Sequence, residues 1–258
     1  MSRLRPLASL LFAALLTATG IAPASADPNA LWDIVDGQCV PNQRQHGDPA
    51  PCAEVDLDGG YAVLKDLVGA TQFLLIPTAR LGGIESPELL APGAPNYFAD
   101  AWRARAFVDQ RAEQAIPRDW MSLAINSVAA RSQNQLHVHV DCVRADVREA
   151  LARNASRLGP TWQPFPEPLA EQQYLATVVA GADLDGVNPF VALADGVAGA
   201  RADMGLQTLV AVGTYLPDGQ PGFVLLTDRA DPAAGRIAEG EQLQDHDVCP
   251  PPHNQWAK

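Results

Sequence analysis

The sequence predicts an α+β fold, an antiparallel sheet with helices packed on one face. Apolar runs rich in β-branched and aromatic residues recur in neighbouring pairs with turn residues between them, which is typical of hairpins. Two other stretches place apolar residues at helical spacing among charged ones. Strands and helices of these kinds are the parts from which such a sheet with packed helices is built.

The first half predicts a hairpin, a loop and a helix. Residues 61–67 and 71–78 are β-rich and apolar, with Gly69 at the turn between them. Residues 80–96 are rich in glycine and proline and predict a loop. Residues 97–115 follow with an amphipathic helical pattern, which ends before Pro117.

The next elements surround two histidines. Residues 120–126 predict a strand and residues 127–134 a polar loop. The stretch "QLHVHVDC", residues 135–142, alternates polar and apolar side chains as a half-buried strand does. Residues 144–158 then predict an amphipathic helix, which Gly159 and Pro160 end.

A proline-rich stretch, residues 161–170, predicts a linker near the middle of the chain. Beyond it, "TLVAVGTYL" and "GFVLLTD" flank "PDGQP" and predict a second hairpin. Because "FVLLT" echoes the earlier "FLLIP", we keep as a hypothesis that the second half is a degenerate copy of the first. We expect a single domain over residues 27–258, with a catalytic half at about 27–160 and a second half at about 170–250.

The N-terminus has the layout of a secretory signal. Arg3 and Arg5 precede an apolar run, and Ala24 and Ala26 supply the small residues of a cleavage site. The run is shorter than the roughly 18 to 20 residues of a spanning helix. We expect export with cleavage of residues 1–26, and an uncleaved membrane anchor is the alternative.

Charge narrows the range of partners. The net charge of −12 becomes −14 without residues 1–26, which contain two arginines and no acidic residue. An acidic surface repels phosphate backbones, so nucleic acid is not an expected partner. It also argues against attachment to anionic lipid by surface charge alone.

The four cysteines, an even number in an exported chain, predict disulfides. Three pairings are open. Cys39 and Cys52 flank a turn-rich stretch that a bridge would hold, so we favour that pair, which leaves Cys142 for Cys249. Structural zinc is the minor alternative, since close CxxC pairs are missing.

The alternation of "QLHVHVDC" divides its side chains between two faces. The apolar face belongs to a core. The polar face meets water or lines a site, and it carries Gln135, His137, His139 and Asp141. Solvated histidines are the simplest interpretation, but two of them two residues apart, after a Ser/Asn-rich loop, favour a site.

Two kinds of chemistry suit this face. "HVHVD" is close to the HxHxDH pattern of metal-dependent hydrolases, with His246 and His253 as the available further ligands. Phosphorus chemistry is the stronger hypothesis, because a neutral imidazole can attack phosphorus without prior deprotonation while a second one supports the phosphate oxygens. That scheme requires no cofactor.

The stretch "NSVAARSQNQLHVHV" resembles the histidine-triad superfamily of nucleotide hydrolases and transferases. Ser132 lies five residues before His137, as the family serine does before its nucleophile, so the resemblance implies that His137 attacks and His139 is the third histidine. Gln135 occupies the position of the first histidine, a departure from the pattern, and we expect it to bind the substrate phosphates together with Asn126 and Arg131. Asn126 and Ser132 match the loop positions that contact the phosphate and the leaving group.

A narrower resemblance runs from about Cys39 to Cys249. "FLLIPTARLGGIESPELL", "RSQNQLHVHVDCVRADV" and "QDHDVC" resemble the bacterial CDP-diacylglycerol pyrophosphatase family. This implies hydrolysis of CDP-diacylglycerol to CMP and phosphatidate in phospholipid metabolism, on the periplasmic side of the inner membrane, with the membrane as the source of substrate. Another nucleotide pyrophosphate as substrate, a metal-dependent hydrolase and a non-catalytic protein are the alternatives. The oligomeric state stays open.

The resemblance also suggests minor roles. Arg131 can make two parallel contacts to a phosphate. Arg80 is a further candidate, although we favour a solvated side chain there, and Arg144 is expected to be a surface charge. The loop after Arg80 and the aromatic pair Tyr97 and Phe98 are candidates to border a site for the acyl chains.

Overall fold

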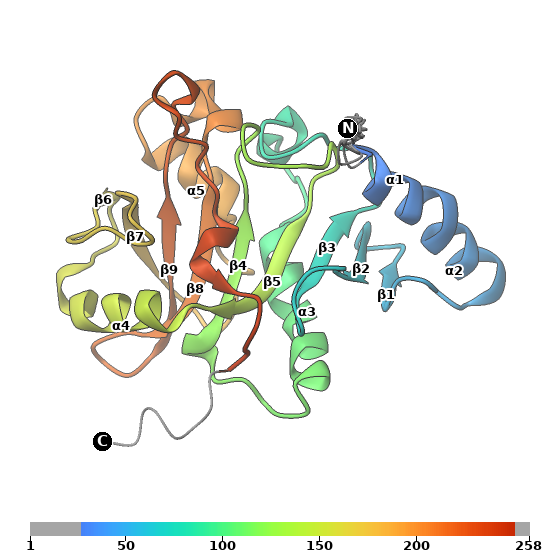
Figure 1. Cartoon of the computed structure of the whole chain (residues 1–258), viewed down its shortest axis with the longest axis horizontal. Coiled ribbons are helices and arrows are strands. Elements are labelled where there is room, and N and C mark those ends of the chain that lie inside the picture. Colours follow the sequence, from blue (N-terminus) through green and yellow to red (C-terminus); the bar gives the residue numbers. More distant parts are fainter. Residues whose placement is uncertain (1–26, 251–258) are drawn as a thin grey trace, which may run out of the picture.

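The computed structural model describes residues 27–250 and contains one ten-stranded antiparallel sheet (Figure 1). The strand order is β1-β2-β3-β5-β4-β8-β9-β7-β6, and β10 pairs with β5 outside this path. The strands are β1 Glu54–Asp56, β2 Tyr61–Lys65, β3 Phe73–Pro77, β4 Met121–Ile125, β5 Val138–Val143, β6 Gln163–Pro164, β7 Leu175–Ala180, β8 Leu209–Tyr215, β9 Pro221–Thr227 and β10 Gln244–Asp245. The predicted α+β class is confirmed.

Two of the longer helices, α3 Tyr97–Arg111 and α4 Ala145–Asn154, lie where the sequence predicts them. A third, α5 Pro189–Gly196, has no counterpart among the predicted elements. Asn96 caps α3, because its side chain accepts a hydrogen bond from the backbone N–H of Ala99. No helix among residues 27–250 combines the length and apolar character needed to cross a membrane.

Both predicted hairpins are present. In the first, Val63 pairs with Leu75, and Gly69 has a φ of +76°, a conformation that glycine adopts without strain. In the second, Val212 pairs with Val224.

The two halves of the chain share one order of elements. A strand, a helix and a hairpin follow one another as β3, α3 and β4–β5, and again as β7, α5 and β8–β9. In the sheet, the three strands of the first half lie in the order β3-β5-β4 and those of the second half continue as β8-β9-β7. The two halves meet at the β4–β8 pair, so that β4 matches β8, β5 matches β9 and β3 matches β7. This arrangement agrees with the hypothesis of a degenerate second copy, which stays a prediction.

The prediction of a linker at residues 161–170 is wrong. Gln163 and Pro164 form β6 at the edge of the sheet, and the side chains of Phe165 and Leu169 are buried in the core. Proline is compatible with an edge strand, which leaves one row of backbone groups unpaired. The alternation of bulky apolar residues with the prolines is the feature that packs this stretch.

Helices lie on both faces of the sheet. On one face, α3 contacts β3 and β5, and Trp102 packs edge-on against Phe223 with ring centroids 4.7 Å apart. Val138 and Val140 of β5 belong to the same core. The helix α4 leaves the end of β5 and runs across to the side of β8 and β9 (Figure 1).

An N-terminal helical segment covers part of the other face. It runs through α1 Ala30–Ile34, a π-helical turn at Val35–Cys39 and α2 Val40–His46. Its buried side chains form a second core with Leu64 and Leu74. Since Leu74 pairs with His139, this is the face that carries the histidines. Helices therefore cover both faces of the sheet, rather than the single face that the sequence predicts.

Both predicted disulfides are confirmed. Cys39 is bonded to Cys52 and ties the start of α2 to the chain entering β1, and Cys142 is bonded to Cys249. The stretch between Cys39 and Cys52 begins as a helix, which its turn-forming residues did not predict. Residues 1–26 and 251–258, and with them the predicted signal and the end of the tail, lie outside the described residues.

Candidate active site

A cavity of about 950 Å³ opens beside the start of β5. Four segments meet there: α1, the β2–β3 hairpin, the loop before β5, and the stretch around β10 near the C-terminus. One side of the cavity is apolar, and it is lined by Ala30, Leu31, Ile34, Pro51, Leu64, Leu67, Val68 and Leu74. The polar side includes Asn126, Ser132, His137, His139, Glu239, Glu241 and His246.

His137 lies directly before β5 and is buried. Its Nδ1 is 2.7 Å from the backbone oxygen of Gln135. A carbonyl oxygen only accepts, so Nδ1 carries the proton and the lone pair is on Nε2. Burial, and secondly the neighbouring His139, lower the pKa of His137 to about 4, which keeps the imidazole neutral at physiological pH.

His139 stands beside it, with the ring centroids 4.8 Å apart. Its Nδ1 is 3.0 Å from a carboxylate oxygen of Glu241 and 2.7 Å from Nε2 of Gln72. Both contacts cannot be hydrogen bonds at once, because the carboxylate needs a proton on Nδ1 and the amide needs a lone pair. The pair with Glu241 fits better, since the Gln72 amide also donates to Asp66. The buried Nε2 of His139 has no partner among the described residues.

Two carboxylates, Glu239 and Glu241, complete the polar side. Burial raises the pKa of Glu241, but its hydrogen bond with His139 and the charge of that histidine outweigh burial and lower it to about 2. Burial and the adjacent Glu241 raise the pKa of Glu239. The sequence analysis did not select either residue. Alternation along an extended strand could not have found them, because Gly240 between them has helical dihedral angles, φ −72° and ψ −34°, and Glu241 begins a 3-10 helix.

Gly240 allows this placement. A Cβ at this position would collide with the Thr208 side chain and come within 2.9 Å of the Ile125 oxygen at the end of β4. Glycine therefore lets the C-terminal stretch lie directly against the sheet. The backbone N–H of Glu241 then donates to Oδ1 of Asn126 at 3.1 Å.

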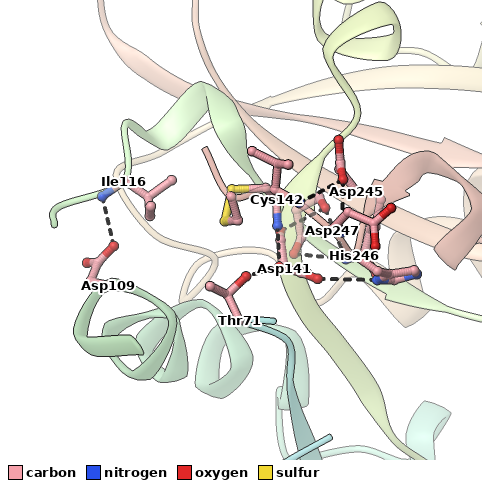
Figure 2. Close-up of a disulfide and its surroundings, with 12 residues drawn as sticks. Thr71, Asp109, Ile116, Asp141, Cys142, Asp245, His246 and Asp247 are labelled. Carbon is pink, nitrogen blue, oxygen red and sulfur yellow. Dashed lines mark hydrogen bonds and ion pairs between the residues drawn. A yellow bond between two sulfur atoms is a disulfide. The ribbon is translucent and has the colours of Figure 1, made fainter. Parts of the chain in front are cut away.

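A second pair of a histidine and a carboxylate, His246 and Asp141, lies near β10. Nδ1 of His246 is 3.2 Å from Oδ2 of Asp141, whose Oδ1 accepts from the hydroxyl of Thr71 at 2.9 Å. Figure 2 shows Asp141 between these partners, next to the disulfide of Cys142. The hydrogen bond to Asp141 raises the pKa of His246. His246, considered in the sequence only as a metal ligand, thus lines the cavity as an ion-pair partner.

The predicted site residues divide into two groups. His137, His139, Asn126 and Ser132 line the cavity. Gln135 and Arg131 are not among the residues that line it, and both are engaged elsewhere.

Gln135 and Arg131 hold neighbouring loops. The side-chain amide of Gln135 donates to the backbone oxygens of Pro77 and Ala79, at 3.0 and 2.8 Å. Arg131 forms an ion pair with Glu85 at 2.5 Å. Gln135 therefore accepts the hydrogen bond of His137 with its backbone oxygen, while its side chain is hydrogen-bonded to the backbone at the end of β3.

The two other arginines lie at the surface, as the sequence predicts. Arg80 is exposed, with its guanidinium 5.1 Å from the centroid of the Trp32 ring. Arg144 pairs with Asp146 at the surface. Tyr97 and Phe98 are buried in the core, so the suggestion that they border an acyl-chain site is wrong.

A metal centre has no obvious ligand set within residues 27–250, where no three or more His, Cys, Asp or Glu side chains form a group that could hold a metal ion. Asp141, a proposed ligand in the metal hypothesis, is bonded to Thr71 and His246. His253 lies outside the described residues.

Comparison with known proteins places the site in a family. The model of the CDP-diacylglycerol pyrophosphatase family matches residues 26–250, which include every residue of the cavity. The chain belongs to this family. A CDP-diacylglycerol pyrophosphatase of Yersinia pestis is 42% identical over 228 residues, which cover 88% of this chain and 87% of that protein. The match extends over both halves of the sheet.

Proposed function

We propose that this protein hydrolyses CDP-diacylglycerol to CMP and phosphatidate through a covalent cytidylyl-histidine at His137. Family membership supports the substrate. The observation that carries the mechanism is the state of His137, a neutral imidazole in a cavity, with Nδ1 bonded to a backbone oxygen. A nucleophile with this arrangement needs no base to activate it.

In the first step, Nε2 of His137 attacks the phosphorus on the cytidine side. An N–P bond forms, the bridging P–O bond breaks, and phosphatidate leaves with the electron pair. The histidine becomes positively charged, and the Nδ1 proton stays bonded to the Gln135 oxygen, which spreads that charge.

The neighbouring polar groups support the phosphate oxygens. As the imidazolium that donates to Glu241 from Nδ1, His139 can donate to a phosphate oxygen from its buried Nε2, and Asn126 and Ser132 line the same cavity. Contacts with Glu241 hold His139 and Asn126 in place before substrate arrives, and groups that are positioned in advance are effective in stabilising developing charge. In this scheme Glu241 holds His139 by the hydrogen bond to Nδ1.

In the second step, water attacks the same phosphorus. An O–P bond forms, the N–P bond breaks, and CMP is released with His137 neutral again. Glu239 and Glu241 are the carboxylates of the cavity that can accept the proton from water. Glu239, with its raised pKa, is the stronger base of the two.

We also propose export to the periplasmic side of the inner membrane, where the membrane supplies the lipid substrate. Two disulfides that leave no free cysteine among the described residues support an oxidising compartment. The signal pattern of residues 1–26 supports the same proposal.

The test is turnover of CDP-diacylglycerol by His137→Ala beside His46→Ala, which changes an exposed histidine on α2. We expect the first variant to lose roughly four orders of magnitude or more and the second to keep wild-type activity. Full activity of His137→Ala would refute the catalytic assignment. Loss of wild-type activity in EDTA, restored by zinc, would favour the metal-dependent alternative.

A further inference from the structure

The turn between β2 and β3, residues 66–70, exposes apolar side chains beside the cavity. Leu67 is fully exposed and Val68 is 60% exposed, the two highest values for large apolar residues within the described part of the chain. Side chains of this kind in water are costly unless something covers them.

The turn is well ordered by its own polar groups. The ammonium of Lys65 donates to the backbone oxygens of Asp66 and Gly69, at 2.7 and 2.9 Å. The backbone N–H of Ala70 donates to the oxygen of His246 at 3.0 Å. These hydrogen bonds hold the backbone of the turn against the rest of the protein, while the side chains of Leu67 and Val68 point into solvent.

This turn is continuous with the apolar side of the cavity. Leu67 and Val68 line its mouth, and the wall continues through Leu64 and Leu74. Leu74 pairs with His139, so the wall leads directly to the proposed phosphate site. Leu31 and Ile34 of α1 line the same cavity.

Two cations flank the turn, and the carboxylate of its one acidic residue, Asp66, accepts hydrogen bonds from Val68 and Gln72 of the same hairpin. Arg111 at the end of α3 is exposed, and its Nε donates to the backbone oxygen of Ala70 at 3.2 Å. Lys65 lies beneath the turn. Basic side chains next to exposed apolar ones complement a surface that has anionic head groups and an apolar interior.

We propose that the turn carrying Leu67 and Val68 inserts into the lipid surface that holds the substrate. The apolar wall then receives the lipid part of a substrate molecule as its pyrophosphate reaches His137. The inference rests on the proposed function for the identity of the substrate. The contact with lipid itself rests on the exposed side chains, the flanking cations and the continuity with the cavity.

The experiment compares two forms of substrate. One is long-chain CDP-diacylglycerol in phosphatidylcholine vesicles, and the other is a dihexanoyl analogue dissolved as monomers. Leu67→Asp and the uncharged Leu67→Gln are measured beside Tyr215→Asp, which alters an exposed aromatic residue on β8. We expect the ratio of vesicle rate to monomer rate to fall about tenfold or more in both Leu67 variants and to stay at the wild-type value in Tyr215→Asp.

An unchanged ratio in both Leu67 variants would overturn the proposal. So would an equal loss on the two substrates, since the turn would then serve a single substrate molecule rather than a lipid surface. Co-sedimentation with phosphatidylglycerol vesicles tests the same contact without turnover, and we expect both Leu67 variants to bind less than wild type. Wild-type enzyme that binds vesicles through Leu67 but hydrolyses neither substrate would refute the proposed function and leave the lipid contact standing.

Discussion

His137 and His139 lie two residues apart, yet their surroundings differ. His137 is buried and bonded to a neutral backbone oxygen, whereas His139 faces the carboxylate of Glu241. The first arrangement leaves a lone pair on Nε2, and the second places a negative charge behind the ring. This difference is what divides attack from phosphate support in the proposed mechanism.

Burial of His137 should make the fold sensitive to acid. The pKa of His137 is about 4 in the folded chain and near 6.5 in the unfolded chain. Between pH 6.5 and pH 4 the histidine is therefore protonated in the unfolded chain but neutral in the folded one. As pH falls from 7 to 4, this group should lower the free energy of unfolding by about 3 kcal/mol. Urea unfolding of wild type and His137→Gln at both pH values measures it. An identical pH dependence in the two proteins would contradict the assignment.

Glu241→Gln should reduce catalysis with little change in substrate binding. A hydrogen bond to a charged group contributes about 1.5–3 kcal/mol, which corresponds to roughly a ten- to hundredfold lower kcat. Glu88→Gln, an exposed change in the 3-10 helix Pro87–Leu90, is the control. The measurement is kcat and KM on CDP-diacylglycerol. A rise in KM at unchanged kcat would show instead that Glu241 acts in binding.

The sequence predicts part of the site at this scale. Alternation puts His137 and His139 on one face, and the preceding loop supplies Asn126 and Ser132, all of which line the cavity. Alternation cannot show that the amide of Gln135, on the same face, is already taken by two backbone oxygens. Partners of that kind come from distant parts of the chain.

Of all the elements, the C-terminal stretch around β10 contributes the most site residues that local sequence patterns did not reveal. It brings Glu239, Glu241 and His246 to a strand about a hundred residues earlier in the chain. The pairing of β10 with β5 and the Cys142–Cys249 disulfide hold it there. The strands and α3, which have strong local periodicity, were predictable, whereas the N-terminal helices owe their place to packing on β2 and β3.

Loss of the two disulfides should have unequal effects. The bridges close 107 and 13 residues, for which chain entropy predicts losses of about 5 and about 3 kcal/mol. We expect Cys142→Ala/Cys249→Ala to be the less stable double variant and to lose activity, because the stretch carrying Glu241 is released. Chemical denaturation and turnover of both double variants test this. Equal stability and activity in the two would contradict it.

At the scale of the whole molecule, one sheet joins both halves. The β4–β8 pair makes the sheet continuous, so the second half supports the strands that carry the histidines. The cavity combines the N-terminal helix, the β2–β3 turn and the C-terminal stretch. No single stretch of sequence predicts such a site, because its parts meet only when the sheet has formed.

The covalent intermediate at His137 is the central claim. The most direct measurement uses CDP-diacylglycerol radiolabelled at the cytidine-side phosphorus, followed by rapid quenching and peptide mapping. We predict an acid-labile, alkali-stable label on the peptide that contains His137, and no label in His137→Ala. Label on that peptide from the phosphatidate-side phosphorus, or equal labelling of His137→Ala, would contradict the account.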